Sequence, residues 1–294
     1  MEEKPMLVVD GDILLFTIGR LTEDITDFGD QICESFSKED SLKLLEQGLD
    51  DIAELTGYDR EDIIFAISDQ DNFRKRHFPT YKSNRKEVKK PLGLLFLRSH
   101  LLENHEKYQT LMLKELEADD AMGIICTNAN YISIYSQDKD LKTIPARQWD
   151  FKKKKFITPT MHDSMTYLYT QVLTGDTCDG YKGCPKIGKV KAAKAFAKCY
   201  TELDLLEKTH WLYYKYYGDN QLAKNKMLEQ IGQAKILHGL DYQMLVQFDQ
   251  TYNPYEVLKV TDEQLDRWVK ENKLREENEK SNNKKRKKIR KKGV

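Results

Sequence analysis

Short runs of apolar residues recur along the first half of the chain and predict buried β-strands. They lie at residues 6–9, 63–67 and 131–135, are rich in β-branched or aromatic side chains, and each ends in a polar or acidic residue. Continuous apolar strands of this kind are typical of a parallel sheet that is buried on both faces. We therefore expect a central, mostly parallel sheet.

Segments with helical spacing of apolar residues separate these strands, at residues 41–56, 92–103 and 118–127. The alternation of strand and helix predicts an α/β fold, with a twisted sheet flanked by helices. In such sheets ligands bind outside the carboxyl ends of the strands. The carboxyl ends of the three strands are therefore the first place to look for a site.

The pattern changes after about residue 160, where it becomes mainly helical with glycines as punctuation. We expect an α/β core over residues 1–160 and a helical part over residues 161–270. Residues 271–294 have few apolar side chains and end in KKRKKIRKKGV, which predicts a basic tail that is mobile or a fraying helix.

Charge is segregated along the chain, although the formal net charge at pH 7 is zero. Residues 1–72 hold 5 Lys or Arg against 20 Asp or Glu, residues 73–100 hold 9 against 1, and residues 271–294 hold 11 against 4. A chain arranged in this way can hold cations and a polyanion together, as a metal-dependent nuclease must. Solvated surface charge explains much of the acidic excess between residues 24 and 62.

Several protein classes are disfavoured by composition. No stretch approaches the roughly 18 apolar residues of a membrane span, and the first residues are acidic where a signal peptide is basic. We expect a soluble, cytoplasmic protein. An odd number of cysteines without C-x-x-C spacing indicates reduced thiols rather than a disulfide framework or a zinc knuckle. The five cysteines are Cys33, Cys126, Cys178, Cys184 and Cys199.

Acidic residues follow each of the three predicted strands. The pairs are Asp10 and Asp12, Asp69 and Asp71, and Asp138 and Asp140. Each acid taken alone is more commonly a turn or cap residue, but their recurrence at three strand ends favours a shared site. Because the carboxyl ends of parallel strands meet at one edge of a sheet, this edge is predicted to be an acidic pocket.

Further acids occur in LEADDAMG and in GDTCDG, and helix capping explains only one of the first group. So many carboxylates in one pocket would raise one another's pKa values unless divalent cations were bound. Oxygen ligands suit Mg²⁺ or Mn²⁺, whereas zinc calls for His or Cys. Two such ions about 4 Å apart can promote hydrolysis of a phosphodiester. The additional acids are Glu117, Asp119, Asp120, Asp176 and Asp179.

A basic segment with interleaved aromatic residues directly follows the second strand. Basic side chains can neutralise phosphates while rings stack on unpaired bases, so the segment is a candidate single-strand contact. A charge run alone is commonly a solvated face, and its attachment to the acidic edge is what favours a function. It contains Phe73, Arg74, Lys75, Arg76, Phe78, Tyr81, Lys82, Arg85, Lys86, Lys89 and Lys90.

A second candidate phosphate contact lies in GCPKIGKVKAAKAF at residues 183–196. Gly183 and Gly188 form a predicted tight turn ahead of a helix that begins with lysines, and backbone N–H groups at such a turn can hold a phosphate. The pattern is weak alone, but it follows Asp176 and Asp179 by a few residues.

Five motifs together resemble one known family in their order and spacing. They are VVDGD, SDQDNFRKRHFPTYKSNR, LEADDAMG, SQDKDLKTI and GDTCDGYKGCPKIGKVKAAKAF, over about residues 6–200. The chain resembles the 5′-nuclease superfamily, which includes flap endonucleases and the 5′-nuclease domains of bacterial DNA polymerases. Within it, YKSNRKEVKKPLG and EQIGQAKIL are similar to the double-strand-specific 5′→3′ exonucleases of short-tailed T-odd phages.

This resemblance implies two Mg²⁺ or Mn²⁺ ions. Lys82 and Arg85 would stabilise charge on the scissile phosphate. Asp12 and Asp71 do not match the family's ligand positions. The first ion would be held by Asp10, Asp69, Glu117, Asp119 and Asp120, and the second by Asp138, Asp140, Asp176 and Asp179.

The resemblance also implies how DNA is bound. A helical arch is expected at about residues 73–105, although Pro91-Leu92-Gly93 makes it short and leaves the threading of long flaps open. A helix-turn-helix element is expected at about residues 176–200, where this family often binds K⁺. The implied DNA contacts are Lys75, Tyr81, Lys82, Arg85, Lys86, Lys89, Lys90, Gly183, Gly188, Lys189 and Lys191.

The implied function is a monomeric 5′→3′ exonuclease on duplex DNA, with flap endonuclease and RNA-primer removal as further activities. Its place would be phage replication or recombination in the cytoplasm of an infected bacterium. Two alternatives stay open. The DGD motif could instead belong to a haloacid-dehalogenase phosphatase with an Asp nucleophile. The chain could also be a DNA-binding factor that keeps the nuclease fold without catalysis.

Overall fold

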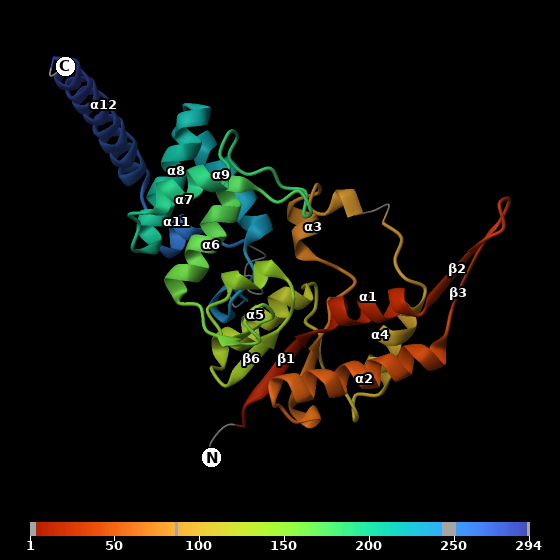
Figure 1. Cartoon of the computed structure of the whole chain (residues 1–294). Helices are drawn as coiled ribbons and strands as arrows, with labels where there is room; N and C mark the ends of the chain where they lie inside the picture. Colours follow the sequence, from red (N-terminus) through yellow and green to blue (C-terminus); the bar gives the residue numbers. More distant parts are fainter. Residues whose placement is uncertain (1–3, 86–87, 243–250, 293–294) are drawn as a thin grey trace. The chain divides into compact units, whose positions relative to one another are not determined.

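The computed structural model describes residues 4–85, 88–242 and 251–292, with side chains to residue 284 (Figure 1). It divides into two compact units. The first comprises Met1–Ser164 and Lys235–Gln250, and the second comprises Met165–Ala234 and Thr251–Val294. The segment that begins at Lys235 thus returns to the first unit, which the expected domain ranges did not include.

A six-stranded sheet forms the centre of the first unit, in the order β5-β4-β1-β6-β7-β8. Neighbouring strands from β5 to β7 are parallel and β8 is antiparallel to β7. The expected mostly parallel sheet is therefore confirmed, with β1 between β4 and β6. The strands are β1 (Met6–Asp10), β4 (Ile63–Ala66), β5 (Gln109–Leu111), β6 (Ile132–Tyr135), β7 (Gln148–Asp150) and β8 (Lys155–Ile157).

Helices cover both faces of this sheet because successive side chains of a strand point to opposite sides. Leu7 and Val9 pack in one cluster with α1, α2 and α4, whereas Val8 packs in another with α5 and Ile236. The three helices predicted from spacing are confirmed, within a few residues at their ends. The bounds are α1 (Gly11–Leu21), α2 (Lys38–Thr56), α4 (Gly93–Glu103) and α5 (Ala118–Asn128).

The segment expected to form an arch, residues 73–105, includes a helix that belongs to the core. Leu97 and Leu101 of α4 are fully buried against α1 and α2, so α4 is held in the layer that covers the sheet. The described part ahead of α4 contains only α3 (Phe73–His77) and the 3-10 turn η2 (Ser83–Arg85). An arch could therefore use only the residues before Gly93.

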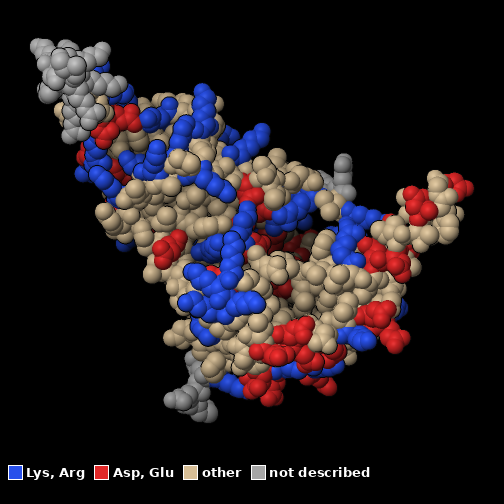
Figure 2. All heavy atoms as spheres, viewed as in Figure 1, with Lys and Arg blue, Asp and Glu red and all other residues tan. Residues whose placement is uncertain are grey.

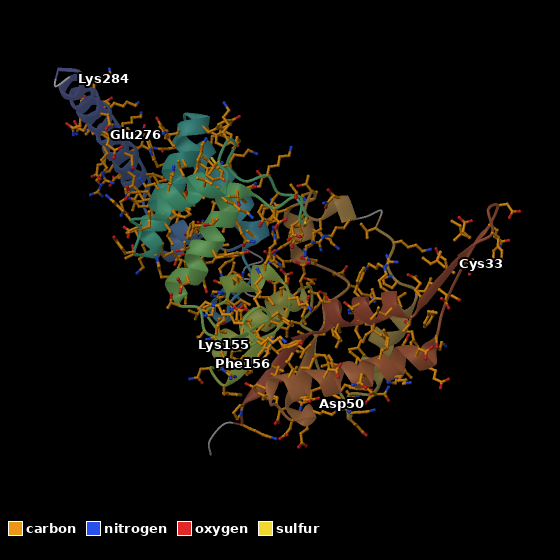
Figure 3. All side chains as sticks on the ribbon, in the orientation of Figure 1. Cys33, Asp50, Lys155, Phe156, Glu276 and Lys284 are labelled. Carbon is orange, nitrogen blue, oxygen red and sulfur yellow. The ribbon has the colours of Figure 1, made fainter. Side chains whose placement is uncertain are left out.

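A two-stranded antiparallel hairpin, β2 (Glu23–Asp27) and β3 (Ile32–Phe36), extends from the first unit (Figure 1). It was not predicted. Ile25, Phe28 and Ile32 are exposed on it, and acidic side chains gather at its tip (Figure 2). Cys33 lies on this hairpin (Figure 3), and all five cysteines are free thiols, as expected.

The second unit is helical, as expected for the C-terminal half. Its core includes Tyr169, Tyr213 and Tyr255. The basic tail continues the last helix instead of forming a separate segment. No described helix is long and apolar enough to cross a membrane. The helices are α6 (Met161–Thr174), which begins in the first unit, α7 (Lys189–Phe196), α8 (Glu202–Tyr217), α9 (Asn220–Ala234), α11 (Pro254–Val257) and α12 (Asp262–Lys292).

Candidate metal centre

The carboxyl ends of β1, β4 and β6 lie side by side, and Asp10 is the last residue of the middle strand. Its Oδ1 accepts a hydrogen bond from the backbone N–H of Ile13 at 3.0 Å, which makes Asp10 the N-cap of α1. Its Oδ2 accepts from the Ser136 hydroxyl at 2.8 Å, just beyond β6. Asp10 is therefore buried at the meeting point of two strands.

Helix α5 brings a second group of acids to the same edge. The Ser68 hydroxyl, just after β4, accepts from the N–H of Ala118 at 2.9 Å and so attaches the first turn of α5 to this strand end. Glu117 is the N-cap of α5, and Asp119 follows two residues later. The strand ends and α5 thus meet as the acid pattern predicted.

The Ser136 hydroxyl, which donates to Asp10, also accepts from the N–H of Asp138 at 3.0 Å, so Asp10 and Asp138 are neighbours, and the charges of both act on Asp119. Burial raises the pKa of Asp119 well above its usual range, and the charges of Asp10 and Asp138 raise it further. Burial likewise raises the pKa of Asp10 to about 6, with Asp12 and Asp138 adding to the shift. Asp10 and Asp119 therefore resist ionisation, and a bound cation beside them would be stabilising.

The donor set is made of carboxylate oxygens, which suits Mg²⁺ or Mn²⁺. Within the described residues, no three His, Cys, Asp or Glu side chains already converge on one point as a finished metal site. Several of the carboxylates are instead engaged by protein donors. The chemistry of the set fits divalent cations, and binding would require these side chains to turn toward them.

Lys82 makes the most informative of these contacts. Its ammonium lies 2.6 Å from Glu117 Oε1, and the Tyr81 hydroxyl donates to Glu117 Oε2 at 2.7 Å. Burial would raise the pKa of Glu117, but the charges of Lys82 and Arg74 outweigh it and hold the pKa at about 2. Lys82 also has a φ of 52°, in the left-handed region that non-glycine residues rarely adopt. Such strained backbone is common at functional sites.

The other predicted ligands of the first unit lie at the strand ends in different environments. Asp69 accepts from the N–H groups of Glu115 and Gln70, both at 2.7 Å, and these bonds lower its pKa. Asp138 accepts from the N–H of Asp140 at 2.8 Å and begins the short helix η3 (Lys139–Thr143). Asp12 accepts from the N–H of Ser68.

Asp120 differs from its neighbours because it is completely buried. Arg74 binds it through both guanidinium nitrogens, at 2.5 and 2.7 Å. This pairing was not expected. Asp120 was predicted as a metal ligand, and Arg74 belongs to the basic segment that was expected to contact DNA. The pair also binds the backbone of Lys235 and Leu237, far along the chain, and a local sequence pattern does not report such contacts.

The basic segment is only partly available to DNA. Lys75, Arg85, Lys89 and Lys90 are exposed, and Lys89 pairs with Glu34 of the β2–β3 hairpin. Tyr81, expected to stack on a base, is 4% exposed because its hydroxyl is directed to Glu117. Lys86 lies outside the described residues.

The second unit carries the remaining predicted residues. Asp176 accepts from the N–H of Cys178 at 2.8 Å and pairs with Tyr181 across a tight turn, with Asp179 in that turn. Gly183 has a φ of 68°, and a Cβ there would lie 2.3 Å from Gly175 N, so only glycine fits. Gly188 is the N-cap of α7, whose first residues include the exposed Lys189 and Lys191. The part of Asp140, Asp176 and Asp179 in metal binding remains a prediction.

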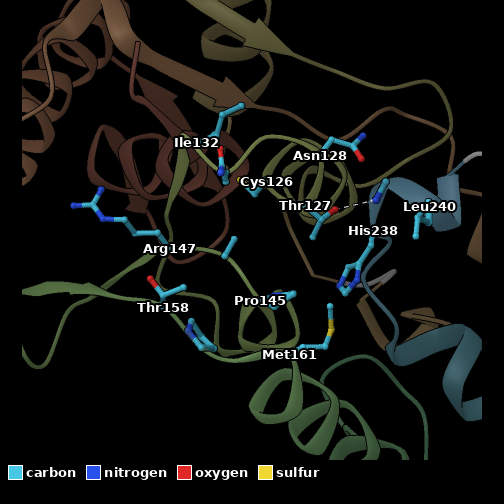
Figure 4. A pocket seen from close by; sticks show the side chains of 14 residues that line it. Cys126, Thr127, Asn128, Ile132, Pro145, Arg147, Thr158, Met161, His238 and Leu240 are labelled. Atoms are coloured by element: carbon cyan, nitrogen blue, oxygen red, sulfur yellow. Dashed lines mark hydrogen bonds between the residues drawn. The ribbon is translucent and has the colours of Figure 1, made fainter. Parts of the chain in front are cut away.

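A cavity of about 590 Å³ lies elsewhere in the first unit, beside the last turn of α5 and the start of β6 (Figure 4). Because the strands are parallel, this is the opposite edge of the sheet from Asp10. Cys126, Asn128, Arg147 and His238 are among its lining residues, and none of the lining residues is acidic. It is therefore not a candidate for the metal centre.

Comparison with known proteins agrees with this geometry. Residues 37–167 match the family described as 5′-3′ exonuclease, N-terminal resolvase-like domain. The chain is 33% identical to an exodeoxyribonuclease of Enterobacteria phage T3 over 204 residues, and 34% identical to an exonuclease of Escherichia phage T7 over 199 residues. Residues 37–167 are therefore similar to a 5′-3′ exonuclease domain, and about two thirds of the chain is similar to phage exonucleases.

The matches to the two phage enzymes cover 64% and 62% of this chain, and they span 65% and 63% of the length of those relatives. A flap endonuclease of bacteriophage T5, solved with DNA and metal ions, has a similar fold at a TM-score of 0.54 and 14% identity, over 90% of this chain and 97% of that chain. The T5 5′-exonuclease with bound zinc gives a TM-score of 0.52 at 16% identity, with the same coverage. At this identity the likeness concerns the fold alone.

The similarity of residues 37–167 to a 5′-3′ exonuclease domain favours a nuclease over the haloacid-dehalogenase alternative. The matched domain contains Asp69, Lys82, Glu117 and Asp138, which are the residues that the structure brings to or beside the edge around Asp10. What local pattern did not reveal is Arg74, whose basic character looked like a DNA contact. A buried position could have been suspected only from the aromatic residues on either side of it in the chain.

Proposed function

We propose that this protein belongs to the 5′-nuclease superfamily and is a divalent-metal-dependent nuclease that hydrolyses duplex DNA from 5′ ends. The observation that carries the proposal is the meeting of Asp10, Asp119 and Asp138 at one sheet edge, with Lys82 bound to the adjacent Glu117. The exonuclease names of the phage T3 and T7 relatives support it. Phage replication or recombination in an infected bacterium is the corresponding setting.

The carboxylates at the sheet edge would hold the cations, and the resemblance to the 5′-nuclease superfamily adds Asp176 and Asp179 as proposed ligands. Bound Mg²⁺ or Mn²⁺ would offset the repulsion among these acids and stabilise charge on the attacking and leaving oxygens of the phosphodiester. Two ions are proposed because the acids outnumber what one ion can use. The two T5 structures that contain metal ions and have a similar fold also support cation binding.

Basic side chains of the protein would stabilise the negative charge on the phosphate. Lys82 is bound to Glu117 beside the acidic edge, and its ammonium would be available to the phosphate if Glu117 bound a cation. There it would meet the negative charge that builds up during attack. Arg85, three residues further along, is exposed and could reach the same phosphate. The left-handed backbone at Lys82 fixes the direction in which its side chain leaves the chain.

DNA would be held by contacts on both units. Exposed Lys75 and Lys90 offer cations for the phosphates near the site, and the turn between Gly183 and Gly188 offers backbone N–H groups ahead of α7. This turn is also where we place a K⁺ ion. Flap cleavage, removal of RNA from an RNA:DNA hybrid, and action as a monomer belong to the same proposal.

Product analysis tests this function directly. Blunt, nicked and flapped duplexes, each labelled at a 5′ end, are incubated with the full chain in Mg²⁺, in Mn²⁺ or in excess chelator. We expect short labelled products from blunt and nicked ends that depend on the cation. Labelled flaps released whole would reveal flap endonuclease activity. Binding without cleavage in either cation would favour the alternative of a non-catalytic DNA-binding factor.

A further inference from the structure

The guanidinium of Arg74 joins three segments of the first unit. It lies in α3, directly after the second acidic strand end, yet only 2% of it is exposed. It donates to both oxygens of Asp120 in α5 and, at 2.5 Å, to the backbone carbonyl of Lys235. The ring of Phe73 lies 4.7 Å from it and that of Tyr81 lies 5.9 Å away. A guanidinium enclosed in this way cannot be a contact for DNA.

The carboxylate of Asp120 is saturated by protein donors. Besides the two bonds from Arg74, its Oδ1 accepts from the N–H of Leu237 at 3.0 Å and its Oδ2 from the N–H of Glu117 at 3.4 Å. A carboxylate offers about four lone-pair sites, and four donors already surround this one. Asp120 is also completely buried. It has no oxygen left to offer to a cation.

The consequence concerns the neighbours of Asp120. Glu117 and Asp119 belong to the same first turn of α5, and the hydrogen bond that the N–H of Glu117 donates to Asp120 closes that turn. The hydrogen bond from the N–H of Leu237 attaches this turn to the segment that begins at Lys235. The bidentate contact from Arg74 restrains the rotation of the turn. A bidentate arginine contact restrains both distance and angle, which a single ammonium would not do.

We propose that Arg74 and Asp120 form a positioning pair that orients Glu117 and Asp119 for cation binding, with Asp120 acting as an anchor instead of a ligand. Partners that orient the ligands of a metal commonly change metal affinity about 10- to 100-fold when they are altered. The inference rests on the proposed function, because it concerns the same acidic edge.

The two roles for Asp120 predict opposite results for Arg74→Lys. Lysine keeps the positive charge but loses the second hydrogen bond. If Asp120 is an anchor, the first turn of α5 loosens and the affinity for Mn²⁺ falls about tenfold. If Asp120 is a ligand, weakening its tie to residue 74 frees its oxygens, and the affinity for Mn²⁺ stays the same or rises.

The measurement is Mn²⁺ binding to the full chain without DNA, followed by the electron paramagnetic resonance signal of free Mn²⁺. Lys75→Gln is the matched control, because it removes an exposed charge from the same helix and should leave Mn²⁺ affinity unchanged. Ile52→Val in the core of the same unit controls for a general loss of stability. Unfolding by urea is measured for every variant.

A second variant covers the case in which Arg74→Lys does not fold. Arg74→Met with Asp120→Leu replaces the buried ion pair by apolar side chains, a change that folded proteins often accept. An anchor predicts Mn²⁺ affinity below wild type but clearly above that of Asp138→Asn. Affinity as low as that of Asp138→Asn would show that a ligand had been removed and would overturn the inference.

These variants distinguish a failure of the positioning pair from a failure of the proposed function. Wild type that binds no Mn²⁺, or Asp138→Asn that binds it as wild type does, contradicts the metal centre and the positioning pair with it. Normal behaviour of those two proteins together with unchanged or tighter binding by Arg74→Lys overturns only the positioning pair. A tenfold loss in Arg74→Lys, with both control variants unchanged, is the result we expect.

Discussion

Lys82 combines a strained backbone, a half-buried ammonium and a direct contact with Glu117. If it acts on the phosphate mainly during attack, Lys82→Ala should lower the single-turnover cleavage rate by roughly 10²- to 10³-fold and change DNA affinity little. The rate is measured by rapid quench at saturating enzyme, and affinity is measured in Ca²⁺. Lys75→Ala, an exposed lysine nearby, should show the reverse pattern. A Lys82→Ala rate within about threefold of wild type, with sharply weaker binding, would make Lys82 a phosphate-binding residue only.

Glu46 gives a residue-scale prediction for stability against pH. Burial would raise the pKa of its carboxylate, but hydrogen bonds from Lys107, Tyr108 and Arg60 lower it from 4.5 to about 2. A lowered pKa means that the contribution to stability is complete above pH 4.5 and is lost as the pH falls to about 2. Because the group is partly exposed, we expect about 1–2 kcal/mol. Glu46→Gln should flatten the unfolding free energy across this pH range, and an unaltered acid limb would contradict the assignment.

At the scale of elements, two helical glycines predict opposite effects of alanine. A Cβ on Gly123 of α5 would lie 2.3 Å from the carbonyl oxygen of Leu237, whereas one on Gly48 of α2 would meet only Leu14 at 3.6 Å. Gly123→Ala should therefore destabilise the fold by about 1–3 kcal/mol through overpacking. Gly48→Ala should stabilise it by about 0.5–1 kcal/mol through helix propensity. Urea unfolding measures both, and stabilisation by Gly123→Ala would contradict the close packing of α5 on the returning segment.

The elements also show where reading a sequence succeeds. Strands β1, β4 and β6 were predicted because a strand buried on both faces consists of a short run of apolar residues. The position of the acids at the ends of these strands could then be read from the sequence. The β2–β3 hairpin was missed because Ile25 and Ile32 are exposed among acids, a pattern that is typical of a solvated surface. Helix α4 was assigned to an arch because local spacing cannot tell a helix packed on the sheet from one above it.

At the scale of the whole molecule, the chain leaves the first unit after Ser164 and returns to it at Lys235. Ile236 and Leu237 of the returning segment pack on side chains of the first unit that lie more than a hundred residues away in sequence. No periodicity carries this information, so the contacts of Arg74 and Asp120 with Lys235 and Leu237 could not be predicted either. The predicted acids are likewise divided, with Asp138 in the first unit and Asp179 in the second.

Asparagine at each of these two acids is the most direct test of the central proposal, that the predicted acids hold catalytic cations. Asp138→Asn and Asp179→Asn each remove one anionic oxygen but leave the exposed lysines in place. Cleavage of a 5′-labelled duplex in Mg²⁺ is measured under single-turnover conditions, with DNA affinity measured in Ca²⁺. We predict that both variants bind the duplex as wild type does and do not cleave it. Cleavage by both variants at nearly the wild-type rate would contradict the assignment of these acids to a metal centre.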